Sequence, residues 1–402
     1  MKITYLLGAG ASAGGNATTL IPNSNPPRYS SIVPVVAGFN KGLIEFLGEL
    51  EHVGSNLTTA FVSLNRGKVV ADIKRCSVDF VQDLELHHSI DTLARKYYVK
   101  YGPNSEQLRF LKFSISAFLI YRQYKHGVDP RYDLFFAAIG DRKSEDTGGI
   151  KLPDSVSILS WNYDNQVELS LRGFSNGYSY VDVKKQIGGH PWLKDKGCFY
   201  PKEINLGFNF LKLNGSADLI VKNDNSIDDL EISNNAICLP HGIDYKEDQI
   251  VMAFAKDKRE KLREHLQYMF HLLMSKPERF RSLLCFSWEE DSHLEGTRNR
   301  LVKVAKETQV LVVIGYSFPT FNRKMDRLLA NSLSKEKLKK IYVQVKPDDY
   351  QSVRSKLIAL FDPKWQVGTI IEHIPQVDEF YVPYELDDDT MHQRPKPIKM
   401  KF

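Results

Sequence analysis

A short apolar strand that breaks into glycines at the N-terminus constrains the fold of this chain most. Residues 1–7 read MKITYLL, a run rich in strand formers, and residues 8–15 continue as GAGASAGG. A strand that ends in glycines and other small residues lets backbone N–H groups approach a phosphate without side chains in the way. The pattern predicts a strand followed by a nucleotide-binding turn, with a tight turn that binds nothing as the alternative.

The spacing of these glycines argues against a dehydrogenase. Gly8, Gly10 and Gly14 read G-x-G-x-x-x-G, one residue longer than the dinucleotide fingerprint. No acidic ribose partner stands out at the usual distance of about 20 residues. If a nucleotide binds here, we expect a different class of protein.

Three further strand patterns end in small or polar residues. They cover residues 156–161, 210–213 and 310–314, and a fourth strand is expected at 341–345. Asn and Asp often end strands for local reasons of turn geometry. In α/β folds, however, ligands bind at the carboxyl ends of parallel strands, so these residues are also candidates for a site. The residues that follow the three patterns are Asn162 and Asp164, Asn214 to Ser216, and Gly315 to Ser317.

Helical patterns fill the sequence between these strands. Residues 33–50 and much of 79–124 show apolar residues at helical spacing. We therefore expect an α/β fold, a Rossmann-like doubly wound parallel sheet, in one domain spanning 1–402. A helical insertion is expected at 76–145, and a mixed helical and loop insertion at 222–300.

Charge and cysteine content indicate to which broad class of proteins this chain belongs. The net charge of +5 over 402 residues is modest, and the basic runs at 256–261 and 335–340 contain acidic residues at helical spacing. Such runs are typical of solvated helix faces, so direct nucleic-acid binding is not expected. The four cysteines form no C-x-x-C pair, which indicates neither a zinc ribbon nor a disulfide framework. With no signal peptide or membrane span in view, we expect a soluble protein of the cytoplasm.

The ordered set of motifs resembles a known family. LGAGAS at 7–12, WNYD at 161–164, KLNGS at 212–216 and GYSF at 315–318 occur in the order of the sirtuin-like family. They are most similar to its bacterial antiviral NAD-hydrolase branch. Residues 89–95 and 108–123 also resemble members of that branch that work with a HerA-type ATPase.

This resemblance implies a sirtuin-like fold with NAD as the substrate and no metal. The first motif would hold the NAD phosphates, Asn162 would lie at the nicotinamide ribose, and the fourth motif would border the adenosine half. The residues that the resemblance places around NAD are Gly8, Ala9, Gly10, Ala11, Ser12, Asn214, Gly215, Ser216, Gly315, Tyr316 and Ser317.

Two departures from the family pattern matter. The paired zinc cysteines of deacetylating sirtuins are absent, which argues against a protein deacylase. The third motif has Asn214 where the family commonly has the catalytic His, and an amide is no general base near neutral pH.

Asn162 can orient a ribose or a water, and Asp164 can add negative charge near an oxocarbenium-like sugar. We predict His190 as the base because histidine has a suitable pKa, with His241 as a weaker candidate.

The leading hypothesis is an enzyme that hydrolyses NAD to nicotinamide and ADP-ribose. By resemblance, it would deplete NAD in an infected bacterial cell and would be controlled by homo-oligomerisation or a HerA-type ATPase partner. The main alternative is a catalytically silent sensor or scaffold subunit that binds NAD or ADP-ribose. A deacylase and a nucleic-acid enzyme are weaker alternatives, the latter because no paired carboxylate cluster for two metal ions is evident.

Overall fold

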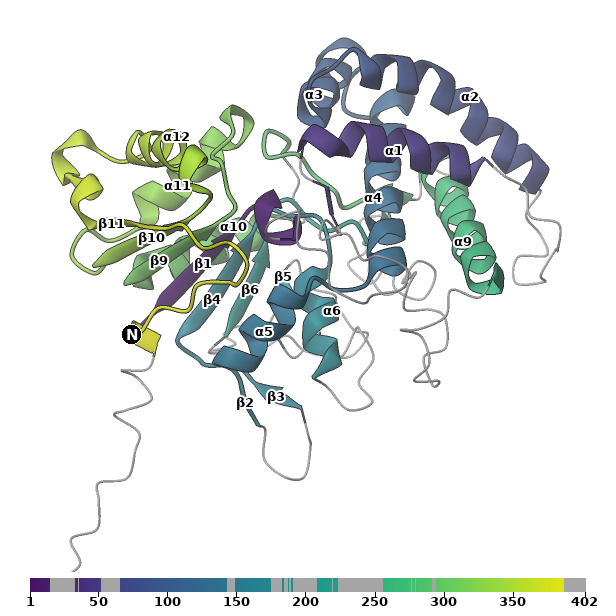
Figure 1. Cartoon of the computed structure of the whole chain (residues 1–402). Coiled ribbons are helices and arrows are strands. Elements are labelled where there is room, and N and C mark those ends of the chain that lie inside the picture. The colour runs from purple at the N-terminus through teal and green to yellow at the C-terminus, as the bar shows by residue number, and fades with distance from the viewer. Residues whose placement is uncertain are drawn as a thin grey trace, which may run out of the picture.

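The sheet at the centre of the computed structural model has seven strands, all paired in parallel. Their spatial order is β11-β10-β9-β1-β4-β6-β5 (Figure 1). The strands are β1 (Ile3–Leu7), β4 (Val156–Ser160), β5 (Gly189–His190), β6 (Asn209–Lys212), β9 (Val310–Ile314), β10 (Lys340–Gln344) and β11 (Ile371–Ile374). The structure describes residues 1–14, 33–34, 36–51, 66–142, 149–174, 183, 187, 189–190, 208–218, 220–222, 256–275, 277–278, 280–290 and 294–386.

Strand β1 is the point at which the winding of the sheet reverses. Ile3 is in register with Val156 of β4 on one side and with Val310 of β9 on the other. All five residues of each of these three strands are buried, as expected for the centre of a parallel sheet. The loops that follow β1, β4 and β9 therefore meet at one carboxyl edge, where α/β sheets bind ligands.

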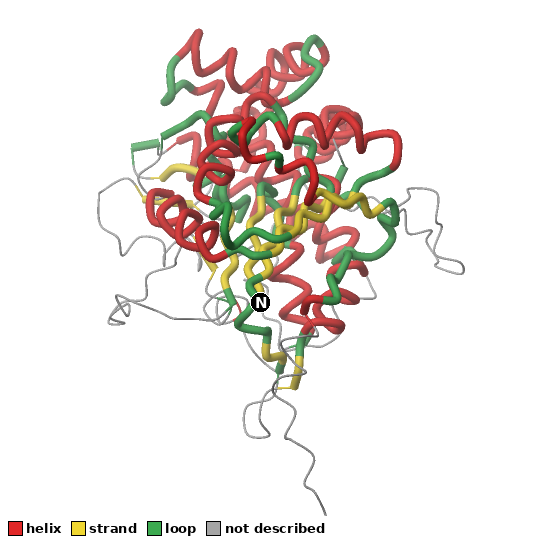
Figure 2. The backbone as a smooth tube through the Cα atoms, turned by 90° about the vertical axis from the view of Figure 1, so that its left-hand side faces the viewer, coloured by secondary structure: helices red, strands yellow, loops and turns green. Residues whose placement is uncertain are grey.

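Helices cover both faces of the sheet, and an apolar core lies on each face. Alternate residues of each strand pack into one core or the other. Leu6 and Val313 pack with α10 (Glu295–Glu307), α11 (Arg323–Ser332) and α12 (Pro347–Ile358) on one face. Tyr5 and Val312 pack with α5 (Pro130–Ile139) and α6 (Gln166–Gly173) on the other. Figure 2 shows strands running between helices on both sides. The predicted α/β, Rossmann-like doubly wound fold is confirmed.

A separate helical layer lies beyond the carboxyl edge of the sheet (Figure 1). Its helices share one apolar core that is distinct from the two sheet cores. They come from residues 36–126 and 256–275, whereas α5, which also falls within the expected insertion at 76–145, packs against the sheet. The helices of the layer are α1 (Val36–Leu50), α2 (Arg66–Glu85), α3 (Ile90–Tyr101), α4 (Glu106–His126) and α9 (Lys256–Ser275).

Local sequence fixes where the helices of this layer begin and end. Ser89 caps α3 by accepting a hydrogen bond from Thr92 N–H, and Ser105 caps α4 through Leu108 N–H. Gly102 ends α3 with a positive φ of 90°, which a side chain would disfavour. These caps fix the start of α3, which brings its first turn to the site described below.

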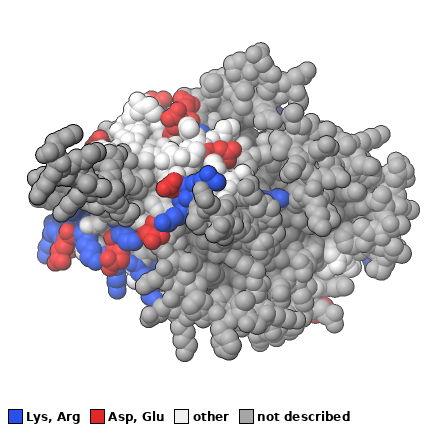
Figure 3. Space-filling model, turned by 90° about the horizontal axis from the view of Figure 1, so that it is seen from below, with Lys and Arg blue, Asp and Glu red and all other residues white. Residues whose placement is uncertain are grey.

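Four short strands form two antiparallel pairs outside the central sheet: β2 (Asp141–Arg142) with β3 (Ile150–Lys151), and β7 (Ile220–Lys222) with β8 (Phe280–Ser282). On the face shown in Figure 3, the described basic side chains lie among acidic ones rather than forming a patch of one sign. Among the described helices, none combines the length and apolar character that a membrane crossing requires.

Candidate functional site

The glycine turn after β1 packs directly against the turn after β9. Gly8 N–H donates to Ile314 O at 3.0 Å, and Gly10 N–H donates to Gly315 O at 2.9 Å. A Cβ atom added to Gly8 would lie 2.6 Å from Gly315 O, closer than real Cβ atoms approach. Gly315 itself has a φ of +59°. Small residues are therefore needed here so that two loops can touch.

This packing uses N–H groups that the sequence had suggested for a phosphate. The turn itself is a short 3-10 helix, η1 (Ala9–Ser12). Ala9 is the exposed residue of the turn and faces a neighbouring cavity. The N–H groups already donated to backbone carbonyls are those of Gly8, Gly10, Ala11 and Ala13. Most of the predicted phosphate donors are thus paired within the protein.

Asn162 follows β4 and is fixed against the glycine turn. Its Nδ2 donates to Gly8 O at 2.9 Å and to Ser12 Oγ at 3.1 Å, and its side chain is buried. An amide nitrogen carries two hydrogens, so both are used. Only the carbonyl oxygen of the Asn162 side chain is left to accept a hydrogen bond from a ligand.

Asp164 lies deeper and is bound within the protein. Its Oδ1 accepts a hydrogen bond from Gln166 N–H at 3.1 Å, at the start of α6. Burial raises the pKa of the Asp164 carboxyl, while the charge of Lys212 and a hydrogen bond from Ser12 lower it. Ser12 in turn lies 3.0 Å from the hydroxyl of Tyr132. The predicted pair after β4 is therefore brought to the site, with Asp164 at the back.

A buried lysine joins the second and third motifs. Lys212 Nζ donates to Asp164 O, to Ser216 Oγ at 2.8 Å and to Glu168 Oε1 at 3.1 Å. Asn165 Nδ2 adds a bond to Ser216 Oγ at 3.0 Å. Lys212 was not among the predicted site residues, although a lysine at the end of an apolar strand is a recognisable signal.

Arg131, from the start of α5, braces the glycine turn from the other side. Its guanidinium donates to Ala11 O at 2.9 Å, to Asp129 Oδ2 at 2.7 Å and to Val377 O at 3.0 Å. These acceptors come from three separate segments of the chain. No local pattern in the sequence pointed to this residue, because its partners are brought together only by the fold.

A cavity of about 210 Å³ opens where these loops meet the helical layer. Seven of the predicted residues line it: Ala9, Asn162, Asp164, Asn214, Gly315, Tyr316 and Ser317. The other six described candidates lie behind this surface and hold the loops in place: Gly8, Gly10, Ala11, Ser12, Gly215 and Ser216. Helical-layer residues complete the wall, including Phe39 and Asn40 of α1, Ile90 and Asp91 of α3, and Ile115 and Leu119 of α4.

Aromatic side chains form one wall of this cavity. Trp161 stacks on Tyr316 with ring centres 5.6 Å apart and planes 16° from parallel. The hydroxyl of Tyr316 donates to Asp326 at 2.9 Å and accepts from Asn322 Nδ2 at 2.9 Å. These contacts fix the ring against which a planar ligand group would pack.

Asn214 lies in the loop after β6, where the motif resemblance leads one to expect a histidine. It is 7% exposed, and its Oδ1 has no hydrogen-bond partner among the described residues. The turn after it presses on a neighbouring loop, since a Cβ at Gly215 would lie 1.7 Å from Leu283 O. Cys285 N–H also donates to Asn214 O at 2.9 Å. Asn214 is thus held rigidly, with one buried polar atom unsatisfied among the described residues.

The predicted base is not placed at this cavity by the described residues. The backbone of His190 belongs to β5, next to Leu211 of β6, and its side chain lies outside the described part of the chain. His241 also lies outside the described residues. No histidine is among the described residues that line the cavity.

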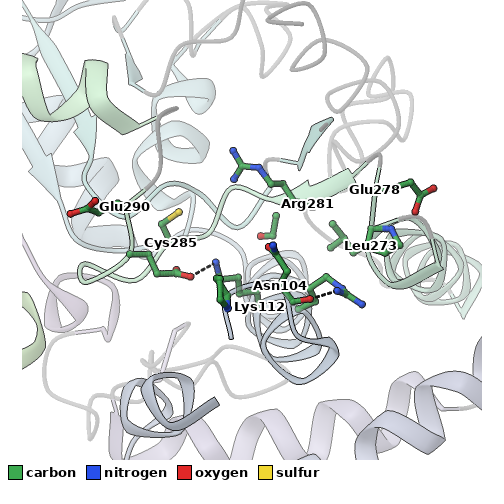
Figure 4. Close-up of a pocket in the computed structure, with 12 residues that line it drawn as sticks. Asn104, Lys112, Leu273, Glu278, Arg281, Cys285 and Glu290 are labelled. Atoms are coloured by element: carbon green, nitrogen blue, oxygen red, sulfur yellow. Dashed lines mark hydrogen bonds and ion pairs between the residues drawn. The ribbon is translucent and has the colours of Figure 1, made fainter. Parts of the chain in front are cut away.

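A second cavity, of about 540 Å³, lies between α4, α9 and residues 280–290 (Figure 4). Lys112 Nζ pairs with the carboxylate of Glu289 at 2.8 Å. The lining carries both signs of charge, with Arg281, Glu278 and Glu290 also present. It contains none of the predicted site residues, so the smaller cavity is the candidate site.

Comparison of the chain with models of known protein families gives no match, and comparison with curated proteins gives none. Across the described ranges, no group of three or more His, Cys, Asp and Glu residues is placed to hold a metal ion.

Proposed function

We propose that this protein hydrolyses NAD at the bond between nicotinamide and ribose, releasing nicotinamide and ADP-ribose. The observation that carries the proposal is the fixed amide of Asn162 at the cavity edge, with its oxygen left for a ligand. A ribose hydroxyl or a water is the donor that this oxygen would orient. The site also lies where a doubly wound sheet reverses, the usual place for a nucleotide.

The charge and shape of the cavity suit this reaction. Departure of neutral nicotinamide leaves positive charge on the sugar, which the carboxylates of Asp91 and Asp164 would stabilise. The aromatic pair of Trp161 and Tyr316 offers a surface for the nicotinamide ring. The described cavity of about 210 Å³ is smaller than typical ligand pockets of roughly 300–1,000 Å³. We infer that it receives the nicotinamide–ribose end of NAD.

The biological part of the proposal rests on the family resemblance of the motifs. The protein would act in the cytoplasm as an antiviral effector that depletes NAD. A homo-oligomer or a HerA-type ATPase would restrain or trigger it. Gel filtration of the protein alone and with a co-encoded ATPase tests this part, and a monomer that binds no ATPase would contradict it.

The rival function is an NAD or ADP-ribose sensor that has lost its chemistry. Asn214 favours it, because no described residue lining the cavity is a histidine. Calorimetry of NAD binding, combined with chromatography of released nicotinamide, separates the two functions. Binding without nicotinamide release, with and without the ATPase, would establish the sensor.

The direct test compares wild type with Asn162→Ala. We expect NAD cleavage by wild type and its loss in the variant, with the circular dichroism spectrum unchanged. Asn331→Ala is a matched control, because Asn331 is an exposed asparagine on α11. Equal turnover by all three proteins would refute the assigned role of Asn162.

A further inference from the structure

Asp91 brings a carboxylate to the cavity from the helical layer instead of from the sheet. It is the second residue of α3, whose start is fixed by the Ser89 cap. Among the described residues that line the cavity, Asp91 and Asp164 are the two with charged side chains. None of the four sequence motifs at the sheet edge contains Asp91.

The two carboxylates differ in how far they are already engaged. Asp164 accepts from Gln166 N–H and Ser12 and faces the charge of Lys212. Asp91 hydrogen-bonds with its own backbone and forms no ion pair with any residue that the structure describes. Asp91 as a whole residue is partly exposed, whereas Asp164 is buried. Asp91 is the carboxylate that remains available to a bound molecule.

Asp91 lies close enough to two of the motif loops for its charge to act on them. Burial is the main cause that raises the pKa of Tyr163, which follows β4, and of Tyr316, which follows β9, and the charge of Asp91 raises both further. Both tyrosines line the cavity together with Asn162 and Asn214. The first turn of α3 therefore faces the two loops that carry the sheet-edge motifs.

Asn214 also lines the cavity, but it is not a proton acceptor. Its Oδ1 is buried without a hydrogen-bond partner in the described structure. An amide oxygen accepts a hydrogen bond but takes up no proton near neutral pH. Another group must therefore accept the proton of the attacking water, and Asp91 and Asp164 are the charged residues in the described lining.

We propose that Asp91 is the general base of NAD hydrolysis in this protein. This inference rests on the proposed function. The water oxygen forms a bond to C1′ of the nicotinamide ribose, and the C1′–N bond breaks with its electron pair going to nicotinamide. The proton lost by the water passes to the Asp91 carboxylate and then to solvent, so the products are nicotinamide, ADP-ribose and one proton.

The surroundings of Asp91 suit a base. Burial raises the pKa of its carboxyl from the ordinary value, and a higher pKa makes a carboxylate a better proton acceptor. The titratable groups that face it across the cavity are Tyr163, Tyr316 and Asp164. Arg95, one turn along α3, lies over the rings of Tyr98 and Trp288. Asp326 accepts a hydrogen bond from Tyr316, and burial raises the pKa of Asp326 to about 7, so the experiment must separate its effect from that of Asp91.

Asp91→Asn is the first test, because it keeps the shape of the side chain and removes the base. We expect kcat to fall by about 10²–10⁴-fold, the usual contribution of a general base, with ADP-ribose affinity nearly unchanged. The kcat of wild type should decline as acid protonates Asp91, and this decline should be absent in Asp91→Asn and present in Asp326→Asn. Asp348→Asn is the matched control, since Asp348 is the exposed second residue of α12.

Rescue by azide gives a readout that a purely structural role would not produce. Azide needs no base, so it should attack C1′ in Asp91→Ala and form ADP-ribosyl azide, which mass spectrometry detects. Azide should not restore turnover to Asn162→Ala, in which the sugar is no longer oriented.

The outcomes separate this inference from the proposed function. If wild type releases no nicotinamide, both fail. If wild type is active and Asp91→Asn keeps its rate and pH profile, hydrolysis stands and the role of Asp91 is wrong. Loss of ADP-ribose binding in both Asp91 variants would also overturn the role, because Asp91 would then serve binding or folding.

Discussion

Lys212 Nζ lies 3.1 Å from Glu168 Oε1, and the two side chains are only 4% and 2% exposed. The same ammonium group also donates to the backbone oxygen of Asp164 and to Ser216. One buried cation thus ties the loop after β4 to the loop after β6. Asn162 and Asn214, which line the cavity, belong to these two loops.

Removal of the Lys212 charge should destabilise the fold strongly. Lys212→Met leaves Glu168 buried without its partner, so we expect a loss of about 3–5 kcal/mol in the free energy of unfolding. Adding Glu168→Gln should recover part of this loss. Urea unfolding measures both effects. Lys324→Met is the control, because the Lys324–Glu290 pair is exposed and should contribute under about 1 kcal/mol. A similar small loss for Lys212→Met would contradict the role assigned to Lys212.

A methyl group at Gly8 should separate the two packed turns. We expect Gly8→Ala to destabilise the protein by about 1–3 kcal/mol, because its Cβ would meet Gly315 O at 2.6 Å. Gly48 in α1 has no atom within 4 Å of an added Cβ, so Gly48→Ala should stabilise by about 0.5–1 kcal/mol. Thermal unfolding of both variants shows whether the melting temperature falls for Gly8→Ala and rises for Gly48→Ala, as expected. A melting temperature for Gly8→Ala at or above that of wild type would disprove the packing argument.

Stability should fall as the pH rises through the titration of Asp326. Burial raises the pKa of Asp326 from 3.8 to about 7, and the hydrogen bond from Tyr316 lowers it in part. Between these pH values the folded state binds a proton that the unfolded chain has lost. The contribution of this carboxyl to the free energy of unfolding is therefore fully present below about pH 4 and is lost as the pH rises through 7.

Comparison with Asp326→Asn isolates this effect. At about 1.4 kcal/mol per pKa unit, the free energy of unfolding loses at most on the order of 4 kcal/mol through the titration of Asp326. Urea unfolding at pH 5 and pH 8 should show a smaller pH-dependent loss in the variant than in wild type. If the two proteins lose the same stability over this range, Asp326 titrates in the ordinary acid range and the prediction is wrong.

Arg131 should not tolerate replacement by lysine. Its planar guanidinium reaches Ala11 O, Asp129 and Val377 O at once, which a single ammonium group cannot do. We expect Arg131→Lys to lower the free energy of unfolding by about 1–3 kcal/mol, because buried acceptors lose their donors. It should also weaken ADP-ribose binding, since the glycine turn is released. Arg142→Lys, at an exposed residue of β2, serves as the control. An Arg131→Lys protein as stable as Arg142→Lys would show that the three contacts contribute little.

The sequence predicted β1, β4, β6, β9 and β10 of the central sheet and the edge at which the motifs gather, but it did not predict β5 or β11. Central parallel strands are buried on both faces, so β1, β4 and β9 appear as short apolar runs that end abruptly in small or polar residues. These runs can be recognised from neighbouring residues alone. Because Asn162 and Asp164 directly follow one of them, the sequence predicted both at the site, and both line the cavity. The same reasoning assigned the glycines to a phosphate, whereas the structure uses Gly8 and Gly10 to pack against Gly315.

The sequence by itself determined the alternation of strands and helices, because burial and helix capping follow the order of neighbouring residues. Only the tertiary structure decided which side chains share the site. Asp91, Arg131 and Lys212 are distant in the chain from most of their partners, and no local pattern records a contact across the fold. Their roles arise because a doubly wound sheet brings the ends of separate strands to one edge, where the helical layer then covers them.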